Sequence, residues 1–211
     1  MDLSLLIIFW YGILHAFGPD HLTAIADFSI GKDKRKTLLI TFLFAIGHGL
    51  SLFIFAKILE EIEISEEILA YGDIISASVI IGMGVYLLFM VATNRIHLKQ
   101  HLHENGEHLH IWFGKKHNHN QIDTTSSFTI GLLMGIGGVR GMLITLGAVR
   151  GGVVDFSMVG AFTLGVILIF VSFGLLILYI NRNFLNNLQN VRRTFAIAGI
   201  ISLIVGVNNL S

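Results

Sequence analysis

The chain has 211 residues and no net formal charge; 54% of its residues are hydrophobic and only 13% are charged. Soluble domains carry roughly 25% charged residues, so this composition excludes an ordinary water-soluble domain and indicates an integral membrane protein. The absence of cysteine excludes disulfides, thiol redox chemistry and thiolate metal sites. We expect residues 1–211 to form a single transmembrane domain with no organic cofactor and no nucleic-acid partner.

Apolar runs of about 20 residues are long enough to cross a bilayer as helices. Six segments approach or exceed this length: residues 3–30, 37–59, 69–93, 127–149, 157–180 and 194–210. We therefore predict an all-α membrane protein of six transmembrane helices. The first segment lacks a basic N-terminal region and a small-residue cleavage site, so we expect it to be a spanning helix and not a signal peptide.

The first segment contains "HAFGPDH", from His15 to His21, with the only proline of the chain. Ionisable groups inside a spanning helix are costly and mark a substrate path or proton relay. On a continuous helix, His21 and Asp20 would lie roughly 120° and 140° around the axis from His15, too far apart to bind one ion. Pro19 lacks an N–H and clashes with the carbonyl of His15, so we predict a break at Gly18-Pro19.

Such a break has two expected consequences. Gly18 supplies the conformational freedom for a turn, which lets His15 face Asp20 and His21. The carbonyl of His15 loses its helical partner and becomes available as an oxygen ligand or as an anchor for water. The alternative is a proline kink in which the histidines form hydrogen bonds between helices.

The second segment adds His48 within "AIGHGLS", where the flanking glycines allow a neighbouring helix to approach closely. A lone histidine at such a position is often a packing residue, but beside the first-helix motif we predict a ligand. His15, Asp20, His21 and His48 would together offer imidazole nitrogens and one carboxylate. This donor set suits divalent nickel, and also cobalt, copper or zinc.

The long connection at residues 94–126 holds seven of the ten histidines of the chain. Neutral imidazoles bind divalent transition metals, and the irregular spacing favours a flexible collector or sensor over one fixed site. A merely polar, mobile loop is the alternative. The seven histidines are His97, His101, His103, His108, His110, His117 and His119.

Basic residues concentrate in the connections at 31–36, 94–126 and 181–193, whereas glutamates concentrate at 60–67. By the positive-inside rule, the three basic connections face the cytoplasm, so both termini lie outside. The predicted location is the cytoplasmic membrane.

A weak internal repeat aligns Gly12 with Gly131 and Gly18 with Gly137. Under the predicted orientation, the two three-helix halves would form an inverted repeat, as in many secondary transporters; a chance alignment of glycine-rich helices is the alternative. The repeat aligns Arg140 with His21, and Arg140 would either hold a carboxylate such as Asp20 in the empty state or reach water through a helix break. Asp27 would relay ions or protons, or cap the end of its helix.

The pattern of His15, four residues, then Asp20-His21 resembles the signature of the nickel/cobalt transporters (the NiCoT family and its NicO relatives), and "GHGLS" around His48 resembles their second motif. Longer members have eight spans and an acidic residue at the position of Gly18. Six spans with a histidine-rich loop look more like the branch that includes nickel/cobalt efflux proteins. The resemblance implies that these three histidines and Asp20 bind metal and are needed for transport.

We therefore expect a secondary transporter, not an enzyme, with Ni²⁺ or Co²⁺ as substrate and the lipid bilayer as surroundings. No phosphate-binding Gly-x-x-x-x-Gly-Lys-Ser/Thr loop occurs, so energy would come from an ion gradient, the membrane potential or a separate subunit. The alternatives are a membrane metalloenzyme whose His/Asp cluster activates water and a haem carrier using His15 or His21 with His48. The direction of transport and the formation of a homo-oligomer stay open.

Overall fold

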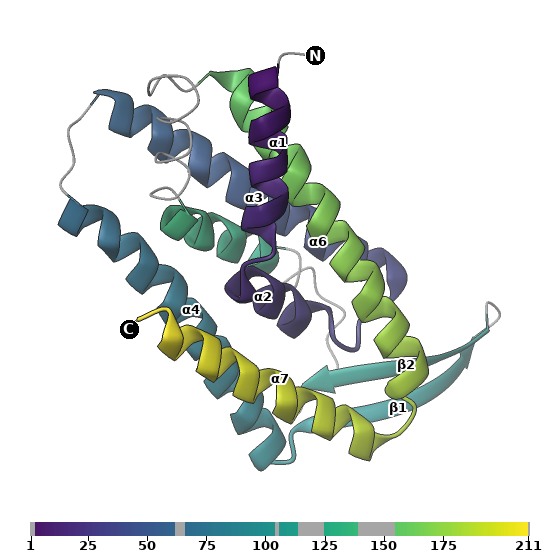
Figure 1. The fold of residues 1–211 in the computed structure, drawn as a ribbon. Helices are drawn as coiled ribbons and strands as arrows, with labels where there is room; N and C mark the ends of the chain where they lie inside the picture. The colour runs from purple at the N-terminus through teal and green to yellow at the C-terminus, as the bar shows by residue number, and fades with distance from the viewer. Residues whose placement is uncertain (1–2, 62–65, 104–105, 114–124, 139–154, 211) are drawn as a thin grey trace.

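The computed structural model describes residues 3–61, 66–103, 106–113, 125–138 and 155–210, and these are mostly helical (Figure 1). The elements before the long connection are α1 (Leu3–Ala16), α2 (Pro19–Ser29), α3 (Lys34–Glu61) and α4 (Glu66–Ala92). Strands β1 (Ile96–His103) and β2 (Gly106–Phe113) follow, then a helical segment at 125–138. Helices α6 (Phe156–Phe184) and α7 (Leu188–Asn208) complete the fold.

Four described helices are long and apolar enough to cross a membrane, within Lys34–Phe55, Tyr71–Ala92, Phe156–Phe184 and Leu188–Asn208. The pair α1 and α2, bent by 62° at a short break, forms a fifth candidate span. Large apolar side chains such as Leu164 and Ile204 point outward, with 61% and 64% of their surfaces exposed, as expected of helices facing lipid. The predicted span at 127–149 is described only as far as residue 138.

Helix starts follow from capping side chains in the sequence. Asp33, Asp155 and Asn187 each accept a hydrogen bond from the backbone N–H three residues later, at 2.9, 2.8 and 2.8 Å. These bonds satisfy N–H groups that the first helical turn leaves without a partner. They begin α3, α6 and α7 close to the membrane boundaries that hydropathy predicts.

Helix α6 is the common support of the fold: α1, α2 and α3 all pack on it, and α4 packs along α7. The short α2 crosses the interior and contacts α3, α4, α6 and α7. The largest buried side chains of this core include Phe44, Phe170 and Met134.

Close helix crossings occur as matched pairs of glycines. At four glycines, a Cβ would collide with the backbone carbonyl of a phenylalanine on the facing helix. Three residues after that phenylalanine, the facing helix has a glycine that makes the same kind of contact in return. The pairs are Gly12 with Phe162, Gly165 with Phe9, Gly47 with Phe128 and Gly131 with Phe44. The contact between α1 and α6 is therefore reproduced between the 125–138 helix and α3.

The contact between α4 and α7 is reciprocal in the same way. A Cβ on Gly84 would lie 2.8 Å from the carbonyl oxygen of Gly199, and a Cβ on Gly199 would lie 3.1 Å from that of Gly84. Leu203 covers Gly84, and Leu88 covers Gly199. The two helices thus meet through equivalent faces.

The described part of the histidine-rich connection, residues 96–103 and 106–113, forms strands where we expected a flexible loop, and it is the exception to the all-α prediction. Strands β1 and β2 form an antiparallel hairpin in which His101 is paired with His108 and Lys99 with His110. At its base, Ile96 is 1% exposed and belongs to the apolar cluster that contains Leu185 and Val191. Apolar and polar residues alternate along "IHLKQHLH" except at Gln100, and such alternation is typical of a half-buried strand.

Candidate metal centre

The break in the first span is confirmed at the predicted place. Gly18 is the N-cap residue of α2 and Pro19 its first residue, a position that suits proline because the N–H there needs no helical partner. The predicted free carbonyl of His15 is wrong, however: its oxygen accepts a hydrogen bond from the Gly18 N–H at 2.9 Å. The chain closes α1 with a tight turn, so this oxygen already has a donor.

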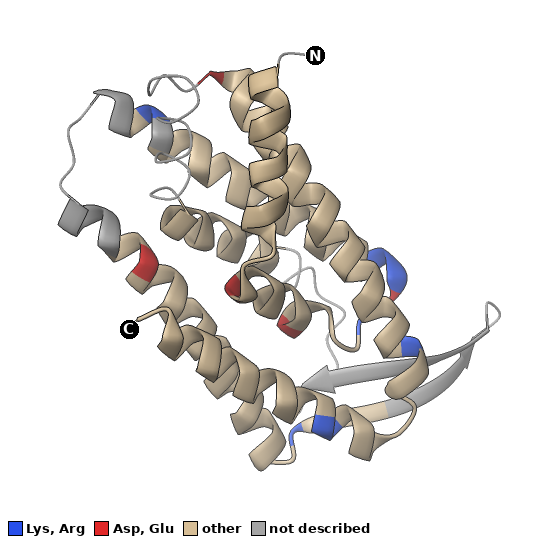
Figure 2. Cartoon of the chain, in the orientation of Figure 1, with Lys and Arg blue, Asp and Glu red and all other residues tan. Residues whose placement is uncertain are grey.

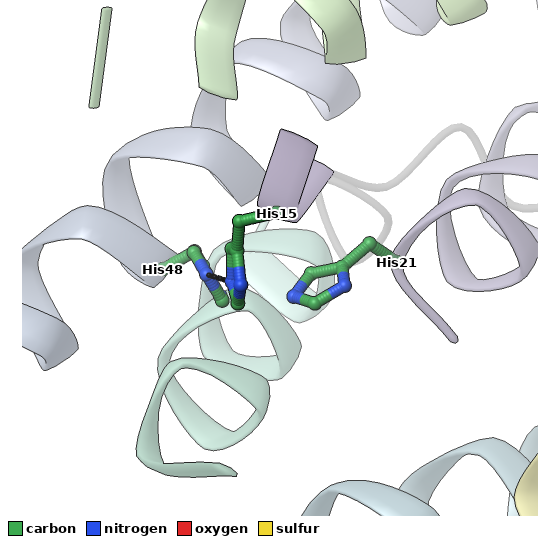
Figure 3. Close-up of side chains that lie close together, drawn as sticks. All are labelled: His15, His21 and His48. Atoms are coloured by element: carbon green, nitrogen blue, oxygen red, sulfur yellow. Dashed lines mark hydrogen bonds between the residues drawn. The ribbon is translucent and has the colours of Figure 1, made fainter. Parts of the chain in front are cut away.

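The break brings together three predicted ligands from three helices. Figure 3 shows the imidazoles of His15 on α1, His21 on α2 and His48 on α3 facing one another. One ring nitrogen from each lies within 4.8 Å of the other two, so the group could hold a metal ion. His15 is half-buried, and His21 and His48 are 4% and 0% exposed, which places the cluster inside the protein.

The spacing of the nitrogens fits a metal ion. The Nε2 atoms of His15 and His48 are 3.1 Å apart and share a hydrogen bond. Two imidazole nitrogens about 2.1 Å from one metal ion would be separated by roughly 3.0–3.4 Å at angles between square-planar and tetrahedral. The Nε2 atom of His21 is buried with no hydrogen-bond partner among the described residues, so it is free to act as the third donor.

Asp20, the fourth predicted ligand, lies beside the cluster and not in it. Its Oδ1 atom is 2.8 Å from Nδ1 of His21. A carboxylate that accepts the N–H of a ligating imidazole fixes the tautomer and makes the other nitrogen a better donor. In this arrangement Asp20 orients His21 and leaves Nε2 for the ion.

Aromatic rings enclose the three histidines. Phe162 lies 5.3 Å from His15 between ring centroids, Phe170 lies 5.8 Å from His21, and Phe44 stacks on His48 at 6.4 Å. Sequence reasoning missed these residues. The one local signal was Phe44, which precedes His48 by one helical turn and so shares its face; Phe162 and Phe170 come from a helix whose approach no sequence pattern indicates.

The 125–138 helix packs against another side of the cluster, and its glycines allow the close approach. A Cβ on Gly138 would lie 3.1 Å from Nε2 of His15, and one on Gly135 would lie 2.6 Å from the carbonyl oxygen of His48. A larger residue at either position would occupy space beside the histidines.

Other predicted polar residues are not part of the cluster. Asp27 contacts Ser202 on α7. Arg140, His117 and His119 lie outside the described residues, and the remaining predicted metal-contacting histidines belong to the hairpin. Three nitrogens on one buried ion would leave coordination positions open, as in sites that exchange ligands and unlike closed structural sites.

Comparisons of the chain with protein-family models, curated proteins and solved structures found no match. The functional argument therefore depends on the residues and their geometry.

Proposed function

We propose that this protein is a secondary transporter that carries Ni²⁺ or Co²⁺ across the cytoplasmic membrane by way of the histidine cluster. The observation that carries the proposal is the convergence of His15, His21 and His48 at the break of a spanning segment. Nitrogen donors without sulfur suit nickel and cobalt. Broken helices at membrane depth are typical of substrate sites in transporters.

The paired glycine contacts support an inverted three-plus-three repeat. Phe9 and Gly12 correspond to Phe128 and Gly131 at one constant offset, in line with the sequence alignment that starts at Gly12. Such halves allow alternating access, in which one half moves against the other around a central site.

The charge distribution supports a cytoplasmic location for the hairpin. In Figure 2 most described basic residues gather toward the end of the helices where β1 and β2 lie. This end would face the cytoplasm by the positive-inside rule. A histidine-bearing hairpin there would collect metal ions beside the transport site.

The metalloenzyme alternative has less support. Water activation at a metal needs a further acid or base beside the ion. Asp20 is engaged with His21, and Asp27 with Ser202. Among the described residues, the carboxylate in contact with a histidine of the cluster is that of Asp20.

Nickel flux in proteoliposomes tests the proposal. Replacement of His21 or His48 with alanine should abolish nickel flux and binding, while Ser172→Ala, at an exposed position on α6, should retain both. Circular dichroism would verify that the helices are intact. Wild-type flux in His21→Ala, or no flux in the wild type under any imposed gradient, would refute the transport role.

A further inference from the structure

A second buried acid lies on α2, away from the histidine cluster. The Oδ2 atom of Asp27 is 2.7 Å from Oγ of Ser202 on α7. Asp27 follows His21 by six residues, which is about 9 Å along a helix axis. It therefore lies between the cluster and the connection after α2, which we place on the cytoplasmic side.

The hydrogen bonds of the Ser202 hydroxyl bear on the protonation state of Asp27. Its Oγ atom is also 2.9 Å from the carbonyl oxygen of Ala198, one turn earlier in α7. A hydroxyl carries a single hydrogen, so it can donate only one of these two bonds. Both contacts can be hydrogen bonds at the same time only when Asp27 is protonated and donates to Ser202, which then donates to the Ala198 carbonyl; when Ser202 donates to Asp27 instead, its contact with Ala198 is not a hydrogen bond.

The environment of the other carboxyl oxygen, Oδ1, also favours the protonated form of Asp27. Its Oδ1 atom is buried and has no hydrogen-bond partner among the described residues. An ionised carboxylate in such a place is costly unless a cation compensates it. In the described part of the chain, Asp27 forms no ion pair. A neutral carboxylic acid avoids this cost.

In the described part of the chain, the surroundings of Asp27 offer little positive charge that could compensate an ionised carboxylate (Figure 2). In Figure 2, acidic residues lie on α2 while basic residues lie mostly at the hairpin end. In the described part of the chain, the one polar contact made by the Asp27 side chain is with Ser202. Among the side chains that the structure describes, the titratable groups on α2 and on the helices around it are Asp20 and His21 (α2), Tyr11 and His15 (α1), Lys34, Arg35, Lys36, His48 and Lys57 (α3), Tyr71, Asp73 and Tyr86 (α4), Tyr179 and Arg182 (α6), and Arg192 and Arg193 (α7).

We propose that Asp27 is a proton-binding site, held as a carboxylic acid against Ser202, which exchanges its proton with the cytoplasmic side as a divalent cation moves through the histidine cluster. The coupling to metal movement depends on the proposed transport function. The protonation of Asp27 depends only on its contacts. Release of the proton leaves a carboxylate that offsets one of the two charges of the entering ion, and rebinding restores the neutral acid.

Infrared spectroscopy of the full-length protein in liposomes tests the protonation without metal. At neutral pH the wild type should show the C=O band of a carboxylic acid. This band should be missing in Asp27→Asn, shifted in Ser202→Ala, and unchanged in the control Asp33→Asn, which alters an exposed acid. Identical carboxylic-acid bands in the wild type and Asp27→Asn would overturn the proposal.

A proton-sensitive dye enclosed in proteoliposomes tests the coupling. The wild type should move protons against nickel. Asp27→Asn should fold and bind nickel, because its amide can donate to Ser202 as the acid does, but it should lose proton movement; Asp33→Asn should keep it. An unchanged ratio of protons to nickel in Asp27→Asn would overturn the coupling. Absence of nickel flux in the wild type would instead refute the transport function and leave the infrared result valid.

Discussion

At Gly18 the important property is the missing side chain. Its backbone angles, φ −50° and ψ 128°, are accessible to any residue, so the conformational freedom that we predicted is not used. A Cβ there would lie 2.6 Å from Oδ1 of Asp20 and 2.7 Å from Nδ1 of His21. Gly18 thus leaves room for the side chains of Asp20 and His21, whose hydrogen bond orients the imidazole of His21.

Gly18→Ala should weaken nickel binding by about 10–100-fold, the usual range for disturbing a residue that orients a metal ligand. Isothermal titration calorimetry measures the affinity. Gly160→Ala is the matched control, because a Cβ there would meet nothing within 4 Å. Equal affinities for the two variants would show that Asp20 and His21 tolerate the added methyl group.

Asp20→Asn should also reduce nickel affinity by about 10–100-fold, with little change in unfolding temperature. The amide oxygen still accepts the N–H of His21, but it lacks the charge that strengthens the opposite nitrogen. Titration of the purified variant beside Asp33→Asn measures the loss. A complete loss of binding would make Asp20 a direct ligand, contrary to its position in the structure.

At the scale of elements, the sequence was sufficient where one residue has a strong local effect. Pro19 cannot continue a helix, so the break between α1 and α2 could be predicted. The hairpin was missed because only the number and clustering of its histidines entered the prediction, and not their order along the chain. Their alternation with apolar residues around an Asn-Gly dipeptide is a hairpin signal.

The hairpin should matter most when nickel is scarce. The double variant His101→Gln/His108→Gln removes two histidines that face each other in the register. We expect slower flux at low nickel concentration and an unchanged maximal rate, because the intramembrane cluster is intact. Flux measured over a range of nickel concentrations, with Gln100→Ala as control, tests this. A reduced maximal rate would contradict a collecting role.

At the scale of the whole molecule, hydropathy predicts which segments enter the membrane but not how they pack. Helices that are apolar on all sides have no stripe that identifies a partner. The central position of α6 and the rings of Phe162 and Phe170 beside the histidines therefore could not be inferred. Small residues were the available signal, since glycines mark the close crossings.

The repeat predicts equal responses in the two halves. Gly12→Val and Gly131→Val should lower stability by similar amounts, about 1–3 kcal/mol or more, because each side chain would enter an equivalent backbone contact. Thermal unfolding in detergent measures both. Gly82→Val is the control, since a Cβ there would meet nothing within 4 Å. A large loss in one variant and none in the other would argue against equivalent halves.

The support that α6 gives to α1, α2 and α3 has a consequence for selectivity. The side chain of Asn181 on α6 bonds the Gly31 N–H and the carbonyl oxygens of Ser29 and Lys32, at 3.0, 2.9 and 3.1 Å, and so fastens the end of α2. The helices that carry the three imidazoles, α1, α2 and α3, therefore all pack on α6, and α6 itself contributes none of the three histidines. A small axial shift of α6 would change the spacing of the three imidazoles, so substitutions remote from the nitrogen atoms are expected to alter which cation the proposed site accepts.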